Sequence, residues 1–249
     1  MIAMKDNPIL ECVNLTKDYG AMTALDNVNL KIGRGKIVGV LGPNGSGKTT
    51  LIKLANGLLK PTDGQILIDG QEPGIRSKEI VSYLPDKEYF GRWMKVRDVI
   101  NLFTEFYSNF DRAKALRMCE TLRISEDMPV KSMSKGTLEK LQLVLVMSRN
   151  AELYLLDEPI AGVDPAARDF ILSTIINNYN EEGTIIISTH LISDIERILD
   201  EVVFIKDGRV VRHSTVDQIR EQEGKSIDEL FRTEFRMTAP GEEEARYDW

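Results

Sequence analysis

A glycine-rich segment that ends in a lysine and a threonine has the residue types and spacing to hold a phosphate chain. It fits the pattern G-x4-G-K-[ST] and comprises Gly42, Pro43, Asn44, Gly45, Ser46, Gly47, Lys48 and Thr49, with Thr50 directly after it. Glycines let backbone N–H groups curl around phosphate oxygens, and the N-terminus of a following helix adds partial positive charge. Lys48 can reach the β- and γ-phosphates, and the Thr49 hydroxyl suits Mg²⁺. The segment predicts a nucleotide-binding loop; a glycine-rich turn with a capping threonine is the less specific alternative.

Two acidic residues follow an apolar run at residues 153–156, namely Asp157 and Glu158. Nucleotide sites of α/β sheets form at the carboxyl ends of the strands, which is where these side chains would emerge. Asp157 suits Mg²⁺, directly or through water, and Glu158 is placed to polarise a water against the γ-phosphate. A helix cap is the alternative for either acid, and the phosphate loop makes it the weaker interpretation.

A histidine repeats this arrangement, because His190 follows the apolar run at residues 184–188. A lone histidine is more often structural than catalytic, but its position after a core strand favours a catalytic role. At that edge it could hydrogen-bond the γ-phosphate or the attacking water. The other histidine, His213, lies in a polar stretch, and we assign it no role.

The elements that must position these residues follow from hydrophobic alternation and turn residues. Strands are predicted over residues 9–15, 25–32, 36–41, 65–68, 80–84, 153–156 and 184–188. Helices are predicted over residues 50–59, 165–179 and 191–199, with a helical layer over 96–150 and two short helices over 215–235. Asp207-Gly208 between apolar runs predicts a hairpin. Strands that alternate with helices imply parallel pairing in an α/β core.

The composition is that of a soluble globular protein, with 249 residues and 42% hydrophobic residues. No apolar run approaches the ~18 to 20 residues that span a bilayer, and the first residues do not resemble a secretory signal. We therefore expect a cytoplasmic protein. The 32 basic against 39 acidic residues argue against nucleic acid as a main partner. Cys12 and Cys119 have no metal-binding spacing.

The segment from Met133 to Thr137, which opens the helix ending near Asn150, resembles the signature sequence of ATP-binding cassette (ABC) ATPases. With Ala161-Gly162-Val163-Asp164 and His190 further on, the order of motifs is similar to that family over about residues 9–224. The resemblance implies a P-loop NTPase fold, a mostly parallel sheet with helices, an N-terminal antiparallel β subdomain and an inserted helical subdomain. We expect one ABC ATPase domain over residues 1–235, with a RecA-like core (about 1–86 and 151–224) and a helical subdomain (about 87–150). Residues 225–249 would form a C-terminal helix and an acidic tail.

The resemblance also implies how the site is completed. Two such domains would pack head to tail around ATP and Mg²⁺. The second domain would be either another copy of this chain or a paralogue. Ser134 and Gly136 would then contact the nucleotide of the partner, and Ser134 would cap its own helix. Tyr19 matches the aromatic residue that stacks on adenine, with plain packing as the alternative. Asp164 matches the residue that links the two sites.

Three residues depart from the pattern of the family. Lys135 stands at the usual first glycine of the signature, and Thr137 stands at its usual glutamine. Asp86 stands where a glutamine normally contacts Mg²⁺ and water. An aspartate still ligates Mg²⁺ but adds negative charge beside the phosphates, so nucleotide affinity and coupling are the properties that these departures affect.

The function implied by the resemblance is that of the ATP-binding subunit of an ABC transporter, peripheral on the inner face of the membrane. It would drive a separate transmembrane permease subunit, and the short chain and signature resemble antibiotic or multidrug exporters. The aromatic-rich segment that holds Tyr89, Phe90, Trp93, Met94 and Val96 is either a docking surface for that subunit or local core.

The alternative function is that of a soluble ABC ATPase that acts on ribosomes or DNA. Members of that kind carry a second cassette or a long coiled coil, and this sequence has no second cassette and no heptad run between Lys48 and Ser134. An ordinary phosphate-loop kinase would have no use for the signature or for Asp164.

Overall fold

The computed structural model describes residues 7–87 and 89–235, and it leaves out the side chains of residues 166 and 167. The predicted acidic tail lies outside the described residues. A six-stranded sheet with the order β5-β6-β7-β3-β8-β9 forms the centre of the fold. Its strands are β3 (Ile37–Leu41), β5 (Val81–Leu84), β6 (Leu153–Asp157), β7 (Thr184–Thr189), β8 (Glu201–Lys206) and β9 (Arg209–Thr215). The first five strands of that order pair in parallel, which confirms the predicted α/β core.

The sheet is buried on both faces because side chains alternate between two apolar clusters. Val38 and Val40 of β3 join one cluster, and Ile37 and Leu41 join the other. Helix α1 (Lys48–Ala55) packs on the first face. The helices α6 (Pro165–Asn178) and α7 (Ile192–Ile195) pack on the second, and a 3₁₀ turn follows α7. Such two-sided burial explains why the central strands read as continuous apolar runs.

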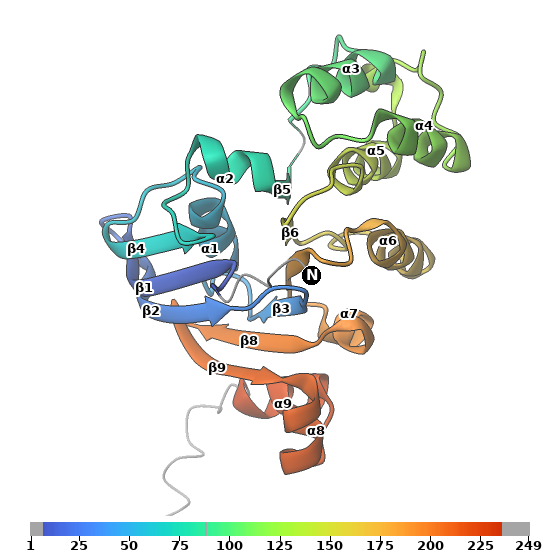
Figure 1. Cartoon of the computed structure of the whole chain (residues 1–249). Coiled ribbons are helices and arrows are strands. Elements are labelled where there is room, and N and C mark those ends of the chain that lie inside the picture. Colours follow the sequence, from blue (N-terminus) through green and yellow to red (C-terminus); the bar gives the residue numbers. More distant parts are fainter. Residues whose placement is uncertain (1–6, 88, 236–249) are drawn as a thin grey trace, which may run out of the picture.

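A smaller antiparallel sheet covers the face that carries α1, with the order β2-β1-β4. Its strands are β1 (Leu10–Asp18), β2 (Thr23–Ile32) and β4 (Asp63–Ile68), the blue and teal arrows on the left of Figure 1. This sheet confirms the expected N-terminal antiparallel β subdomain.

A layer of helices stands beside the sheet at the top of Figure 1. It contains α3 (Val96–Phe106), α4 (Arg112–Thr121), a 3₁₀ turn (Val130–Ser132) and α5 (Lys135–Met147). The prediction of helices without strands over residues 96–150 is confirmed. Helix α5 contacts both strand β5 of the sheet and helix α6. It therefore connects the helical layer with the core.

The end of the described chain follows the predicted pattern. Asp207 and Gly208, with φ of 48° and 78°, form the tight turn between β8 and β9. Two short helices follow, α8 (Val216–Glu223) and α9 (Ile227–Glu234). Each begins with a capping box, in which a Thr or Ser side chain and a Gln or Glu side chain satisfy each other's backbone N–H groups.

Some boundaries differ from the sequence predictions. Helix α1 ends at Ala55 rather than at residue 59, and the helix predicted over 191–199 is the short α7 followed by a 3₁₀ turn. Helix α2 (Ile75–Ile80) was not predicted, because six residues are too few to show a helical period. Within the described residues, none of the helices has the length and apolar character that crossing a bilayer requires.

A buried arginine joins the helical layer to the core. Arg149 is 3% exposed, and its guanidinium donates hydrogen bonds to the backbone oxygens of Lys78, Glu79 and Val81. It also lies 3.8 Å from the centre of the Tyr107 ring. Burial lowers the pKa of this guanidinium to about 10, which keeps it charged at neutral pH. The cation therefore ties the end of the α5 segment to the end of α2 and the start of β5.

Replacing Arg149 with Met tests this connection. Arg149→Met leaves three carbonyl oxygens without their donor, so we expect it to lower the free energy of unfolding by about 3 kcal/mol. The measurement is urea denaturation followed by circular dichroism. Arg117→Met, which removes an exposed arginine from the same layer, is the matched control, and equal stability of the two variants would contradict the role given to Arg149.

Candidate nucleotide site

The glycine-rich loop lies between β3 and α1, with its path fixed by neighbouring backbone. Gly47 has φ of 109°, and a Cβ there would lie 2.5 Å from the backbone oxygen of Ala24. A Cβ on Gly42 would lie 2.4 Å from the backbone oxygen of Ile205. Both distances are far below a normal contact, so these positions require glycine. The loop therefore has a shape set by strands β2 and β8 on either side of it.

Lys48 folds back over this loop. Its side chain is buried, and its Nζ donates to the backbone oxygens of Gly42 at 2.8 Å and Pro43 at 3.1 Å. Burial lowers the pKa of the ammonium group, and the nearby Glu158, whose Oε1 is 3.5 Å from Nζ, acts in the opposite direction. The cation thus lies over the loop, where a phosphate chain would bind.

Asp157 is held by hydroxyl groups from two other elements. Thr49 Oγ1 donates to its Oδ1 at 3.0 Å, and Ser188 Oγ donates to the same oxygen at 2.6 Å. Its Oδ2 is buried and has no hydrogen-bond partner. Burial raises the pKa of Asp157, the two hydroxyl groups lower it, and the charge of Asp86 raises it. A buried acceptor beside a threonine hydroxyl is a donor set of hard oxygens, which fits Mg²⁺.

Glu158 has a left-handed backbone, with φ of 50°. Its N–H donates to the backbone oxygen of Ser188 at 3.0 Å and to Ser188 Oγ at 3.1 Å, so the turn is held by β7. Such a conformation costs about 1 kcal/mol or more outside glycine and persists where neighbours impose it. His190 Nδ1 lies 3.2 Å from Glu158 Oε1 and 3.1 Å from Oε2. The strained turn therefore brings the carboxylate between Lys48 and His190.

A hollow of about 340 Å³ lies over the glycine-rich loop and beside Glu158. It is lined by Met22, Ala24, Asn44, Gly45, Ser46, Gly47, Lys48, Thr49, Thr50 and Glu158. The structure thus brings the predicted loop residues together with Glu158. Tyr19 lies next to this hollow at the end of β1, where its N–H bonds to the backbone oxygen of Met22, and its ring is exposed. The Lys17 ammonium lies over this ring, 5.2 Å from its centre, and an exposed aromatic ring of this kind can stack on a flat ligand.

The residues of the signature lie on the surface, away from the hollow at the phosphate loop. Ser134 caps α5 as predicted, since its Oγ accepts the N–H of Thr137 at 3.2 Å. Both Ser134 and Gly136 are exposed, and so is Asp164. Among the described residues around the 340 Å³ hollow, none of these three is present. One copy of the chain therefore does not bring them to its own phosphate loop.

The sequence analysis did not identify two residues that the structure places at the site, Ser188 and Met22. Ser188, which holds Asp157 and the Glu158 turn, ends an isoleucine run, and its hydroxyl at the edge of a core strand was the available signal. Met22 lines the hollow near Tyr19, and a lone methionine in a loop gives no signal.

The aromatic segment after Asp86 divides between the two predicted roles. Met94 and Val96 are buried, and Phe90 packs against the core, as the local-core interpretation requires. Tyr89 and Trp93 are 46% and 82% exposed. A groove of about 490 Å³ lies beside this segment, between the helical layer and the core. Its lining includes Tyr83, Tyr89, Phe103, Tyr107, Lys53, Lys78, Lys87 and Arg149.

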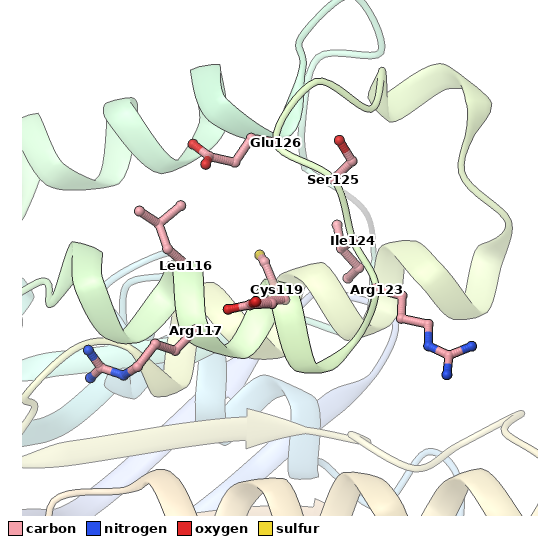
Figure 2. Close-up of a pocket in the computed structure, with 8 residues that line it drawn as sticks. Leu116, Arg117, Cys119, Arg123, Ile124, Ser125 and Glu126 are labelled. Carbon is pink, nitrogen blue, oxygen red and sulfur yellow. The ribbon is translucent and has the colours of Figure 1, made fainter.

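A further hollow of about 550 Å³ lies within the helical layer, at α4 and residues 123–126. Figure 2 shows Leu116, Cys119 and Ile124 at its walls, with Arg117 and Arg123 pointing away from it. Because its charged groups do not converge, we assign it no chemistry.

The fold and the loop define a phosphate-loop nucleotide-binding protein. The family model described as ABC transporter matches residues 25–161, more than half of the chain. A lantibiotic transport ATP-binding protein of Streptococcus pyogenes is 30% identical, covering 90% of this chain and 96% of the relative. The ABC transporter ATP-binding protein YtrB of Bacillus subtilis is 30% identical, covering 86% of this chain and 74% of the relative. The chain therefore belongs to the ABC transporter family, and it is an ATPase.

Solved structures agree on the fold. An ATP-binding subunit of an ABC transporter superposes with a TM-score of 0.79 at 29% identity, covering 92% of this chain and all of the other. A dimeric ATP-binding cassette in a post-hydrolysis state, bound to ADP and phosphate, has a TM-score of 0.72 at 22% identity, covering 83% of this chain and 98% of the other. The predicted P-loop NTPase fold is confirmed.

Lys48→Ala tests the phosphate loop. Removing the buried ammonium takes away the cation over the loop, so we expect ATP and ADP to bind about tenfold more weakly or worse. A fluorescent nucleotide titrated into purified protein measures this. Lys60→Ala removes an exposed lysine just beyond α1 and serves as the control. Unchanged affinity in Lys48→Ala would show that the phosphates bind elsewhere.

Proposed function

We propose that this protein is the ATP-binding and ATP-hydrolysing subunit of an ABC transporter, which dimerises on ATP to drive a separate transmembrane permease subunit. The observation that carries the proposal is the position of Glu158. Its carboxylate lies 3.5 Å from the Lys48 ammonium at the phosphate loop and 3.1 Å from the ring of His190. A carboxylate between a phosphate-binding cation and a histidine is suited to activate water against a terminal phosphate.

In this proposal the chain binds the phosphates of ATP through the backbone N–H groups of residues 42–48 and through Lys48. Thr49 and Asp157 would hold Mg²⁺, with Asp86 contributing from the segment after β5. Bound there, the ion would neutralise negative charge on the phosphates. The buried, unpaired Asp157 Oδ2 supports this role, because such an oxygen otherwise lacks a partner. Tyr19 stacks on the adenine ring.

Hydrolysis then depends on the Glu158 turn. The carboxylate accepts a proton from the attacking water, and Lys48 and His190 stabilise negative charge on either side of it. The backbone hydrogen bonds from Glu158 to Ser188 support this role, since they hold the carboxylate before the nucleotide arrives. His190 also contacts the γ-phosphate and so distinguishes ATP from ADP.

A second cassette completes each site. Ser134 and Gly136 at the exposed N-terminus of α5 contact the γ-phosphate of the partner subunit, and Asp164 links the two sites. Their exposure in one chain supports this, and so does the similar cassette that is dimeric with ADP and phosphate. We divide the chain into a RecA-like core (about 1–86 and 151–224), a helical subdomain (about 87–150) and the residues from 225 onward.

The permease docks in the groove between the helical layer and the core. Aromatic and basic side chains around a groove of about 490 Å³ favour a short amphipathic helix with acidic residues. Through that subunit the protein is held on the inner face of the membrane. The similarity to a lantibiotic transport ATP-binding protein supports an exporter of the antibiotic or multidrug type.

Glu158→Gln tests the hydrolytic role. The amide keeps the size of the side chain but cannot accept the proton, so we expect ATP turnover to fall by about 100-fold or more while ATP still binds. Steady-state phosphate release and nucleotide titration measure the two quantities. We also expect ATP to drive this variant into a dimer, detected by size-exclusion chromatography with light scattering. Glu182→Gln, at an exposed acid, is the control; full turnover in Glu158→Gln would remove Glu158 as the base.

Purification from the native host tests the transporter assignment. A tagged chain extracted from membranes in mild detergent is expected to bring a polytopic membrane protein in stoichiometric amount. Ala substitutions of the exposed Tyr89 and Trp93 should remove that protein and leave ATP binding unchanged. Recovery of ribosomes or DNA without a membrane protein would contradict the assignment and favour a soluble ABC ATPase.

A further inference from the structure

A buried serine lies where the two acidic residues of the site meet the neighbouring strand. Ser188 is near the carboxyl end of β7, and the parallel register with β6 pairs it with Asp157. Ser188 is 0% exposed and Asp157 is 1% exposed. The three residues before Ser188 are isoleucines, so the packing of this strand does not call for a polar side chain. A hydroxyl group buried at this position therefore needs another explanation.

The two side-chain hydrogen bonds of Ser188 fix the direction of its proton. Its Oγ lies 2.6 Å from Oδ1 of Asp157, and an ionised carboxylate only accepts, so the hydroxyl donates this bond. The lone pairs of Oγ are then left to accept a bond, and the N–H of Glu158 donates to them at 3.1 Å. One hydroxyl group thus joins the side chain of the first acid to the backbone of the second.

The backbone of Glu158 benefits from this second bond, because its φ of 50° is unfavourable outside glycine. The same N–H also donates to the backbone oxygen of Ser188 at 3.0 Å. A substitution of the serine side chain removes the hydroxyl acceptor and leaves the backbone acceptor in place. From this turn the Glu158 carboxylate lies 3.5 Å from Lys48 Nζ and 3.1 Å from His190 Nδ1. Loosening the turn would therefore loosen the position of the carboxylate.

The hydroxyl of Ser188 is the last link in a row of hydrogen bonds that starts at the phosphate loop. Thr49 Oγ1 donates to Oδ1 of Asp157 at 3.0 Å, and the same oxygen accepts from Ser188. Hydrogen bonds that share atoms in this way polarise and strengthen one another. The row connects the residues that would hold Mg²⁺ with the turn that carries Glu158.

We propose that Ser188 is a positioning residue for ATP hydrolysis, whose hydroxyl group holds the Glu158 turn in the conformation that presents the carboxylate to the attacking water. Asp157 orients the hydroxyl, and the hydroxyl acts on the reaction through Glu158 rather than on the reacting atoms. The inference rests on the role of Glu158 as the base in the proposed function.

The first test follows the backbone N–H of Glu158 in the protein without nucleotide. In Ser188→Ala this amide loses one of its two acceptors, so we expect it to exchange with deuterium about fivefold faster, measured residue by residue by NMR. Ser82→Ala is the matched control. Ser82 is a buried serine of the neighbouring strand β5, and its hydroxyl donates to the backbone oxygen of Val146 at 2.9 Å. That variant should leave the exchange of the Glu158 amide unchanged.

The second test separates turnover from binding. Among the described residues that line the 340 Å³ hollow, Ser188 is not present, so Ser188→Ala should bind ATP within about twofold of the wild type. Its kcat should fall about tenfold, because the carboxylate is less well placed. In the background of Glu158→Gln the same substitution should cost less than about twofold in single-turnover rate, because the group that it positions is already lost. Ser82→Ala should keep the turnover of the wild type.

Turnover of Ser188→Ala at the level of the wild type overturns the proposal, and so does an undisturbed Glu158 amide. A tenfold loss that persists in the Glu158→Gln background would assign the effect of Ser188 to another group and overturns it as well. An equal loss in Ser82→Ala would reduce the effect to a general response of the sheet, with the same consequence. Full turnover in Glu158→Gln would instead contradict the proposed function, and the inference with it.

Discussion

The parallel register of three neighbouring strands is the constraint on which the site depends. Leu41 at the end of β3 pairs with Thr189 of β7, and Asp157 at the end of β6 pairs with Ser188. Parallel strands all point their carboxyl ends to one edge, so three separate segments of sequence deliver their polar residues to one place. A shift of one residue in this register would turn Asp157 away from Thr49 and remove the shared hydrogen bonds.

Burial makes that placement effective. Strands β3 and β6 are apolar up to their carboxyl ends, and the side chains of Asp157 and Lys48 are buried beside them, in surroundings that disfavour charge. Burial lowers the pKa of the lysine and raises that of the aspartate. Such groups are stabilised by an oppositely charged partner, and a nucleotide with a divalent cation provides both charges at once. The buried charges of Lys48 and Asp157 destabilise the empty site. Binding of an oppositely charged ligand removes this cost and so favours the bound state.

The predicted components of the site could be named from the sequence because each one is a short motif next to a strong strand signal. The loop at Gly42 and the acid Asp157 come directly after apolar runs, and His190 follows the isoleucine run by three residues. Parallel strands bring such ends together. What could not be predicted depends on contacts between distant segments. The left-handed backbone of Glu158 is imposed by Ser188, thirty residues further along the chain.

The attachment of the helical layer was hidden from the sequence for the same reason. Arg149 looks like an ordinary polar residue after an apolar helix, and its role depends on carbonyl groups at residues 78–81. Tyr89 and Trp93 could be divided from Met94 and Val96 only when the side that faces the core was known. A local sequence pattern predicts whether a segment is a helix or a strand more reliably than it predicts which of its faces a neighbouring segment covers.

Two parts of the helical layer, at opposite ends of α5, differ in character. Arg149 is buried and makes hydrogen bonds to three carbonyl oxygens, so that contact is rigid. Lys135, at the other end of α5, has a side chain that is 75% exposed and touches Glu139 at 3.8 Å. The layer is therefore anchored by a buried cation at one end of α5 and exposes Ser134 and Lys135 at the other end.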